Sequence, residues 1–228
     1  MMKSLRNLVL FGNIVLGSWS CSEVQPKPWG KAAGYYDTRG MPSASLTGGV
    51  NDLPLGADFF GFIDDYSEEN HWDDVQNPYA EFKLYKKATL GSVDSVLGKS
   101  VGPAVQYDRD FSLKQGITRL GLTFEPNLSE YIGGDSLVGA NVYPFSSENG
   151  GVQLGVYAVD YFFNDLFCYD GFFDYDVNPQ DGKPKIVSEI QAGVRIWKNV
   201  YGVVEGRYNE YLDDKFGAGI GLELLLRD

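Results

Sequence analysis

The amino-acid sequence predicts an all-β protein, a single closed antiparallel up-and-down β-barrel of about twelve strands and of the outer-membrane type. Three observations predict this fold class. Strand-length segments with alternating apolar and polar residues fill the chain, turn-forming residues separate them, and a segment typical of exported proteins precedes them. After that first segment, the sequence contains no run of about eighteen apolar residues, so we expect no transmembrane helix.

The first segment has the residue order of a secretory signal. Lys3 and Arg6 precede the apolar run LVLFGNIVLG, and the small residues of SWSC follow it. The apolar run is too short to span a bilayer as a helix. We therefore expect residues 1–20 to be a signal peptide, with lipidation of Cys21 as an alternative, and residues 21–228 to form the transmembrane β-barrel domain.

The expected mature chain is strongly acidic. The full sequence has a formal charge of −12, and removing residues 1–20 takes away two basic residues and no acid, which gives −14. Binding to a nucleic-acid polymer is not expected, because phosphate contacts need clustered Lys and Arg. Cys21 and Cys168 are too few for a disulfide scaffold, and the sequence leaves open whether they pair.

Twelve segments are expected to form strands, with turn-forming residues between them. Most of these segments have the length that a tilted strand needs to cross a bilayer. In chain order, the expected strands cover residues 30–39, 43–50, 57–66, 79–87, 101–110, 116–124, 135–143, 151–162, 170–177, 185–197, 201–211 and 215–226.

The expected strand 185–197 has one apolar and one polar face. Its even positions are apolar apart from Ser188, and its odd positions include Glu189, Gln191 and Arg195. Successive side chains of a strand point to opposite faces. The apolar face therefore forms either the core of a soluble barrel or the lipid-facing surface of a membrane barrel, and this strand alone leaves both open.

The last expected strand favours an interior polar face. Glycines occupy every second position of residues 217–221, on the face opposite the apolar residues. Glycines facing water would only weaken the strand. Inside a narrow barrel they leave space for long neighbours such as Arg195, Glu205 and Arg207.

We expect a three-residue loop, residues 198–200, between the tenth and eleventh strands. A two-residue loop would move Arg207 to the apolar face, because a one-residue slip exchanges the two faces of a strand. With three loop residues, Arg207 lies opposite Gln191, and Asn199 adopts the left-handed backbone conformation.

Aromatic residues near the ends of the expected strands predict belts at the two membrane interfaces. They are Phe111, Phe124, Tyr131, Phe145, Tyr161, Phe162, Phe163, Phe167 and Tyr211.

The segment GADFFGFIDDY, followed by an acidic loop and then YAEFKLYKK, resembles the Tsx-like nucleoside-specific channel-forming outer-membrane protein family. The most specific stretch is Ala57–Asp65, and VGANVY and the closing glycine-rich strand are compatible with the same pattern. The resemblance implies a monomeric twelve-strand barrel in the outer membrane of a Gram-negative-type bacterium, with a narrow pore for nucleosides. The chain departs from the family at its end, ELLLRD, which lacks the terminal Phe common in such barrels, so Leu224 or Leu226 would take its place in the assembly signal.

With the polar face inside, we expect a channel for passive uptake of small polar solutes, nucleosides among them by the resemblance. Opposed charges would pair and narrow the passage, and aromatic rings would offer weak stacking sites of about 1–3 kcal/mol. The expected pore-lining residues are Glu81, Lys83, Tyr85, Arg119, Asn141, Tyr143, Glu189, Gln191, Arg195, Glu205, Arg207 and Glu223.

Enzyme chemistry, a metal and a cofactor are not expected. His71 is the only histidine, and the sequence has no catalytic serine or zinc motif around it. The acidic run at residues 64–74 is typical of a solvated loop. Two other functions remain open: a soluble exported ligand-binding β-barrel, and a structural outer-membrane barrel whose lumen is plugged.

Overall fold

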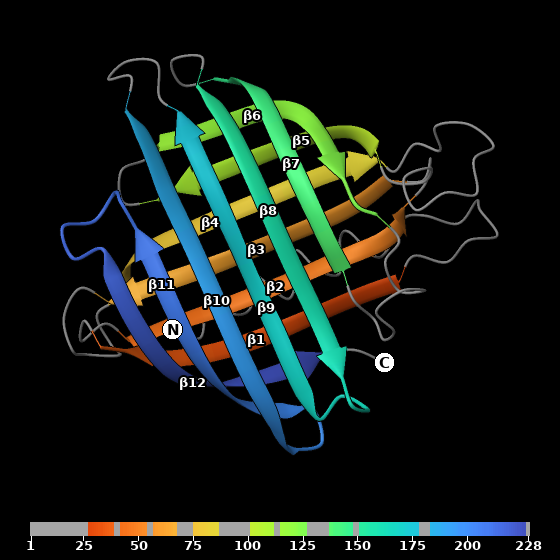
Figure 1. Ribbon diagram of the computed structural model, residues 1–228, viewed down its shortest axis with the longest axis vertical. Coiled ribbons are helices and arrows are strands. Elements are labelled where there is room, and N and C mark those ends of the chain that lie inside the picture. The colour runs from red at the N-terminus through yellow and green to blue at the C-terminus, as the bar shows by residue number, and fades with distance from the viewer. Residues whose placement is uncertain are drawn as a thin grey trace.

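The computed structural model describes residues 27–38, 42–53, 57–67, 75–86, 101–111, 115–126, 137–147, 151–177 and 183–226. The described chain forms twelve antiparallel strands, each paired with its neighbours in sequence, and β1 pairs with β12 to close the barrel (Figure 1). The predicted fold class is therefore confirmed. The predicted signal peptide, Cys21, His71 and Tyr131 lie outside the described residues.

The strands agree in number and order with those predicted. The largest difference is at the start of β4, which begins at Val75 instead of residue 79. The bounds are β1 Lys27–Asp37, β2 Pro42–Leu53, β3 Ala57–Ser67, β4 Val75–Lys86, β5 Val101–Asp110, β6 Gln115–Phe124, β7 Leu137–Ser146, β8 Val152–Phe162, β9 Phe167–Val177, β10 Pro184–Trp197, β11 Val200–Asn209 and β12 Phe216–Leu226.

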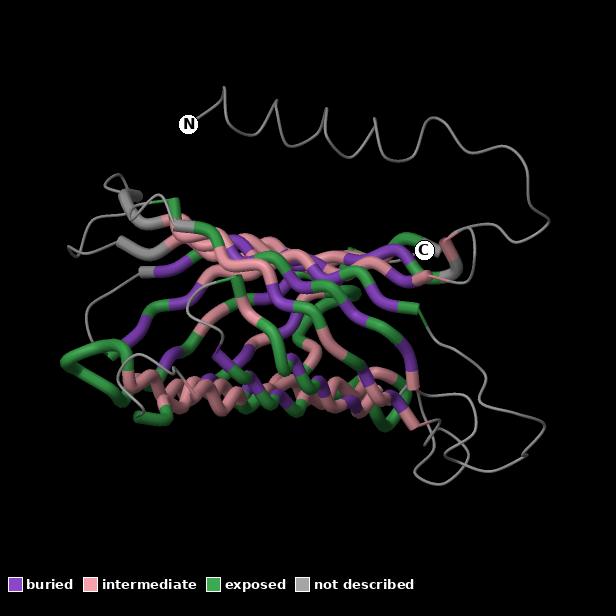
Figure 2. Tube along the Cα trace, turned by 90° about the horizontal axis from the view of Figure 1, so that it is seen from above, coloured by how far each residue is buried: buried purple, intermediate pink, exposed green. Residues whose placement is uncertain are grey.

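Figure 1 shows β7–β11 crossing at a steep angle in front of β1–β5, so the barrel has two walls that face each other. Buried residues alternate with more exposed ones along β5, the first half of β8 and β12, whereas most residues of β9 are partly buried (Figure 2). Within the described residues, no helix is long and apolar enough to cross a membrane.

The apolar faces of the strands point out of the barrel. On β10, the side chains of Ile190 and Val194 are 54% and 41% exposed, whereas Gln191 between them is 2% exposed. The predicted orientation of this strand is therefore confirmed. The same outward band on other strands includes Leu84, Val105, Leu120, Leu122, Val142, Leu154, Val156, Val204, Ile220, Leu222 and Leu224.

The loop between β10 and β11 differs from the prediction. Trp197 pairs with Val200, which leaves a two-residue loop, and the left-handed residue is Lys198, with a φ of 42°, instead of Asn199. Arg207 lies opposite Glu189, whereas the prediction placed it opposite Gln191. The polar face still points inward, because a register shift at Ile196 inserts one unpaired residue and restores the alternation.

The glycine positions of β12 do make room for large inward neighbours. A Cβ at Gly219 would lie 3.3 Å from the Glu205 carboxylate. At Gly221 the neighbour is Tyr35, whose ring carbon Cδ1 would lie 2.7 Å from an added Cβ. Arg195 was also expected over this row, but it lies at one end of the barrel, where it donates to the Asn164 carbonyl at 2.8 Å.

Exposed aromatic side chains gather at both ends of the strands. Phe162, Phe163 and Phe167 contact one another at the turn between β8 and β9, with ring centroids 5.5–6.1 Å apart. Phe145, at the far end of β7, is 67% exposed. Tyr161 was predicted to belong to a belt, but it points into the barrel and packs against Tyr201.

Candidate functional site: the polar interior of the barrel

The predicted pore-lining residues all lie on the inward face of their strands. Residues that are paired between neighbouring strands share a face of the sheet, and the register pairs these residues with other inward ones. Eight of them are buried: Lys83, Tyr85, Arg119, Asn141, Tyr143, Gln191, Glu205 and Glu223. Glu81, Glu189 and Arg207 are partly buried, and Arg195 lies at the end of the barrel.

Arg119 connects two walls of the barrel. It extends from β6, forms an ion pair with Asp108 on the adjacent β5, and reaches Asp176 on β9, where an N–O distance of 3.2 Å joins the two groups. Because β7 and β8 lie between β6 and β9 in the sheet, the second ion pair crosses the interior. One guanidinium is thus shared by two carboxylates.

Lys31 has the same arrangement on the other side of the barrel. It forms an ion pair with Asp170 on β9, and its Nζ lies 3.4 Å from the Glu223 carboxylate on β12. Gln191 on β10 donates to Glu223 at 2.9 Å and accepts a hydrogen bond from the Tyr35 hydroxyl at 3.0 Å. These contacts link β1, β9, β10 and β12 through side chains.

Arg207 is the third shared cation. Its Nε lies 3.0 Å from the Glu189 carboxylate on β10, and its Nη2 donates to Glu205 at 3.1 Å. The guanidinium also lies over the Tyr35 ring, 5.5 Å from its centroid. Cations held by two carboxylates each are positioned by charge-assisted hydrogen bonds, which orders the side chains on this side of the interior.

Strand β9 presents a row of carboxylates to the opposite wall. Asp170, Asp174 and Asp176 occupy even positions on its inward face. Lys31 reaches the first and Arg119 reaches the last. Asp174, between them, is partly buried.

The interior is acidic. Among the described side chains on the inward faces of the strands themselves, twelve acids face six bases. The acids are Asp37, Asp58, Asp64, Glu81, Asp108, Asp110, Asp170, Asp174, Asp176, Glu189, Glu205 and Glu223, and the bases are Lys31, Lys83, Arg119, Lys185, Arg195 and Arg207. No group of three or more His, Cys, Asp or Glu in the described ranges is placed to hold a metal ion.

A row of aromatic rings lines the wall formed by β1, β3 and β4, and the sequence reasoning did not identify it. Trp29 lies 6.0 Å from Phe60, Phe60 lies 6.1 Å from Phe62, and Phe62 lies 5.9 Å from Tyr79, measured between ring centroids. All four rings are partly exposed. The alternation of faces along β3 could have revealed this row, because Phe60 and Phe62 share their face with the inward Asp58.

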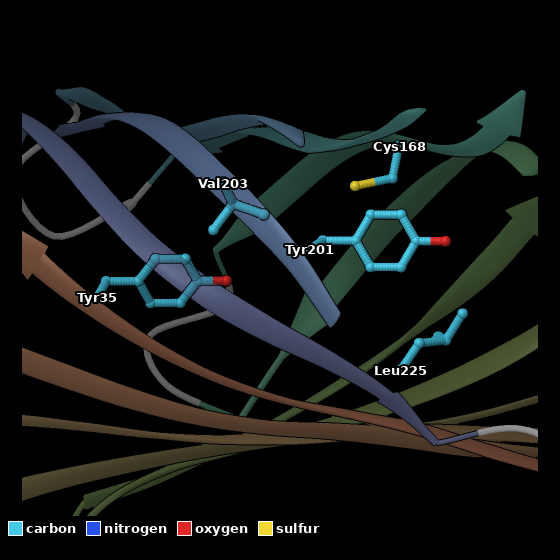
Figure 3. Packing of buried hydrophobic residues seen from close by; sticks show 5 residues of the cluster. All are labelled: Tyr35, Cys168, Tyr201, Val203 and Leu225. Carbon is cyan, nitrogen blue, oxygen red and sulfur yellow. The ribbon is translucent and has the colours of Figure 1, made fainter. Parts of the chain in front are cut away.

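An apolar cluster fills one part of the interior (Figure 3). Tyr35, Cys168, Tyr201, Val203 and Leu225 project from β1, β9, β11 and β12 into the same space, and each is at most 5% exposed. The Tyr201 hydroxyl donates to the carbonyl of Asp165 in the turn between β8 and β9, at 3.0 Å. The cluster narrows the interior next to the Lys31 ion pairs.

Comparison with solved structures supports the fold. Two structures of the KdgM porin are similar to this chain: one, in complex with disordered oligogalacturonate, has a TM-score of 0.52 and 13% identity and covers 86% of this chain and 98% of that chain. The other has a TM-score of 0.51 and 11% identity and covers 85% of this chain and 98% of that chain. No protein-family model and no curated protein sequence matches the chain. At these identities the similarity concerns the fold: this chain has the barrel architecture of an outer-membrane porin.

Proposed function

We propose that the protein is a passive outer-membrane channel for small polar solutes, nucleosides among them. The observation that carries the proposal is the orientation of the strands. Ile190 and Val194 face outward, while Gln191 and Glu223 are buried inside. An apolar exterior around an ionic interior suits a barrel surrounded by lipid and is the reverse of what a soluble ligand-binding barrel needs.

An outer-membrane location is supported by the exterior of the barrel. The outward apolar band covers both walls, and exposed aromatic residues such as Phe145 and Phe163 lie near opposite strand ends. Aromatic side chains favour the headgroup region, where an apolar ring and a polar surrounding coexist. The fold shared with the KdgM porin agrees with this location in a Gram-negative-type bacterium.

Nucleosides are proposed as a solute class on two grounds. The first is the resemblance of Ala57–Asp65 to Tsx-like channels. The second is the aromatic row on β1, β3 and β4, because an accessible ring can stack on a base with about 1–3 kcal/mol. Tyr85 and Tyr143 were expected to offer such surfaces, but they are only 8% and 1% exposed, so Phe60 and Phe62 are the better candidates.

The oligogalacturonate seen with the KdgM porin is not proposed as a ligand here. That ligand is a chain of acidic sugars, and the described interior has more acids than bases. Like charges repel most strongly where the dielectric constant is low, as it is between closely spaced barrel walls. A polyanion would therefore face a barrier in this interior.

A structural barrel with a closed lumen is the second candidate. Tyr143 and Tyr201 are each 1% exposed, which shows close packing of the side chains around them. The ion pairs of Lys31 and Arg119 also cross between the walls.

Conductance in a planar bilayer distinguishes the two candidates. Folded full-length protein should give discrete conductance steps, and added adenosine or uridine should reduce the current. If no steps occur with protein that is folded and inserted, the channel is excluded and the structural barrel is supported. If steps occur but nucleosides leave the current unchanged, the nucleoside assignment is excluded and the general channel is retained.

Membrane fractionation tests the location. The protein should remain with the outer-membrane fraction and require detergent for extraction. Recovery in the soluble periplasmic fraction would contradict the proposed location and support a soluble ligand-binding barrel.

A further inference from the structure

Asp174 differs from the other carboxylates of the β9 row. Asp170 forms an ion pair with Lys31, and Asp176 forms one with Arg119. Within the part of the chain that the structure describes, Asp174 has neither an ion pair nor a hydrogen bond, although Lys83 and Arg119 act on it over longer distances. Its side chain is partly buried on the inward face of β9.

Gly155 leaves a notch beside this carboxylate. The strand register places Asn141, Gly155 and Asp174 side by side on β7, β8 and β9. A Cβ at Gly155 would collide with the Asp174 Oδ1 atom and would lie 3.8 Å from the Asn141 Nδ2 atom. The missing side chain thus leaves room for the Asp174 carboxylate against the backbone of β8, with the Asn141 amide nitrogen nearby.

Two deeply buried polar groups near the notch have no partner among the described residues. Asn141 is 4% exposed and Tyr143 is 1% exposed, yet the Asn141 Oδ1 atom and the Tyr143 hydroxyl form no hydrogen bond within that part of the chain. Glu81, Asp174 and the cation Arg119 are the charged groups that act on the Tyr143 hydroxyl. A buried polar group without a partner is costly, so a ligand that supplies donors here gains binding energy.

The chemistry of these groups selects a positively charged donor. Asp174 and the Asn141 carbonyl oxygen accept hydrogen bonds, and the Tyr143 oxygen can accept one as well. Lys83, whose Nζ lies 3.7 Å from the Glu81 carboxylate, offsets the charge of Glu81, and Arg119 is shared by Asp108 and Asp176. These two cations are fewer than the four surrounding acids, which include Asp174. An ammonium or guanidinium group has several donors, no acceptor and the required charge.

We propose that Asp174, Asn141 and Tyr143, around the notch at Gly155, form a subsite for the cationic nitrogen group of a small solute. This inference rests on the proposed channel function and names the charge class that the interior favours. The acidic lining raises the local concentration of cations near the subsite. Small organic cations should therefore bind in preference to neutral molecules and anions of the same size.

Isothermal titration calorimetry on the folded full-length protein in detergent tests the subsite directly. The probes are putrescine, 1,4-butanediol and succinate, which share a four-carbon chain and differ in charge. Putrescine should bind at about 0.1 M salt, where surface charges are partly screened. Butanediol should bind at least about tenfold more weakly, because hydrogen bonds between a charged group and its partner are the stronger ones, and succinate should not bind.

Three variants locate the binding. Asp174→Asn should weaken putrescine binding about tenfold or more, since it removes the charge and keeps the shape. Tyr143→Phe should weaken it to a smaller extent, and this variant loses no hydrogen bond within the part of the chain that the structure describes. Gly155→Ala should weaken binding by displacing the Asp174 carboxylate from the notch. Asp213→Asn makes the same charge change in the exposed β11–β12 loop and should leave binding unchanged.

The outcomes separate this inference from the channel proposal. Equal binding of putrescine by the wild type, Asp174→Asn and Tyr143→Phe, or no binding by the folded wild type, would overturn the subsite. An equal loss in Asp213→Asn would also overturn it, because the effect would then follow net charge. Putrescine binding without conductance would support the subsite and exclude the channel. Conductance without putrescine binding would support the channel and exclude the subsite.

Discussion

The Lys31 ammonium on β1 forms an ion pair with the Asp170 carboxylate on β9, although three strands separate β1 from β9 around the sheet. The contact spans the interior and joins the two walls. The same ammonium also forms an ion pair with Glu223, which is 2% exposed. A barrel without a continuous apolar core thus gains cross-wall contacts from shared cations.

Lys31→Met should destabilise the barrel by about 3 kcal/mol, because breaking a buried pair leaves the remaining carboxylates without a counter-charge. Urea unfolding of the barrel in lipid vesicles measures the change. The matched control is Lys215→Met, which removes a cation that lies 3.9 Å from Glu210 in the exposed β11–β12 loop and should cost under about 1 kcal/mol. Similar losses in both variants would contradict the role of the Lys31 ion pairs.

Gly221→Ala should destabilise the barrel by about 1–3 kcal/mol, the usual range for overpacking. Its Cβ would collide with the Gly34 carbonyl oxygen and lie 2.7 Å from Tyr35 Cδ1. Gly202→Ala is the control, because its Cβ would meet only Ile196 at an ordinary 3.6 Å. The same unfolding measurement applies. A Gly221→Ala variant as stable as Gly202→Ala would contradict the prediction and would show that neighbouring residues move to accommodate the added methyl group.

Phe60→Ala should weaken nucleoside block of the conductance by about 1–3 kcal/mol, which is about fivefold to hundredfold in the blocking constant, if the bases stack on the inward aromatic row. Phe59→Ala is the matched control on the same strand, because Phe59 points outward and stacks on Phe82 at 6.2 Å. The blocking constant is read from current against nucleoside concentration. Equal effects of the two substitutions would remove the stacking role of Phe60.

Ile190→Arg tests the lipid-facing orientation. Near the bilayer midplane an outward arginine costs about 2–4 kcal/mol, falling to about 0–1 kcal/mol near the interface. Unfolding from vesicles should therefore show a large loss for Ile190→Arg and a small one for Phe163→Arg in the β8–β9 turn. On a water-exposed surface both substitutions would be tolerated within about 0.5 kcal/mol, and that result would contradict a membrane location.

The strand pattern was readable from the sequence because it depends on local alternation. Ile190 and Gln191 lie on opposite faces in any strand, and the composition of each face follows directly. The β10–β11 loop was less predictable. A register shift at Ile196 compensates for the two-residue loop, and the sequence carries no signal that separates this solution from a three-residue loop.

The contacts inside the barrel depend on distances between side chains of different strands, and the alternation of residues along one strand gives no information about these distances. Arg195 was correctly predicted to lie on the inward face of its strand. Its position along the barrel axis, however, places it beside Asn164 and away from the glycine row. Phe60 and Phe62 were on the inward face by parity, yet their alignment with Trp29 needs the register between β1, β2 and β3.

The sequence alone determined that the chain alternates oily and ionic faces along twelve strands, because side-chain direction in a strand is a property of neighbouring residues. Only the closed barrel decided which charges meet. Lys31 and Asp170 stand 139 positions apart in the chain and touch because strand closure and register bring opposite walls together. Among the described residues, the same closure leaves Asp174 without an ion pair, a difference from Asp170 and Asp176 that arises from geometry and not from residue type.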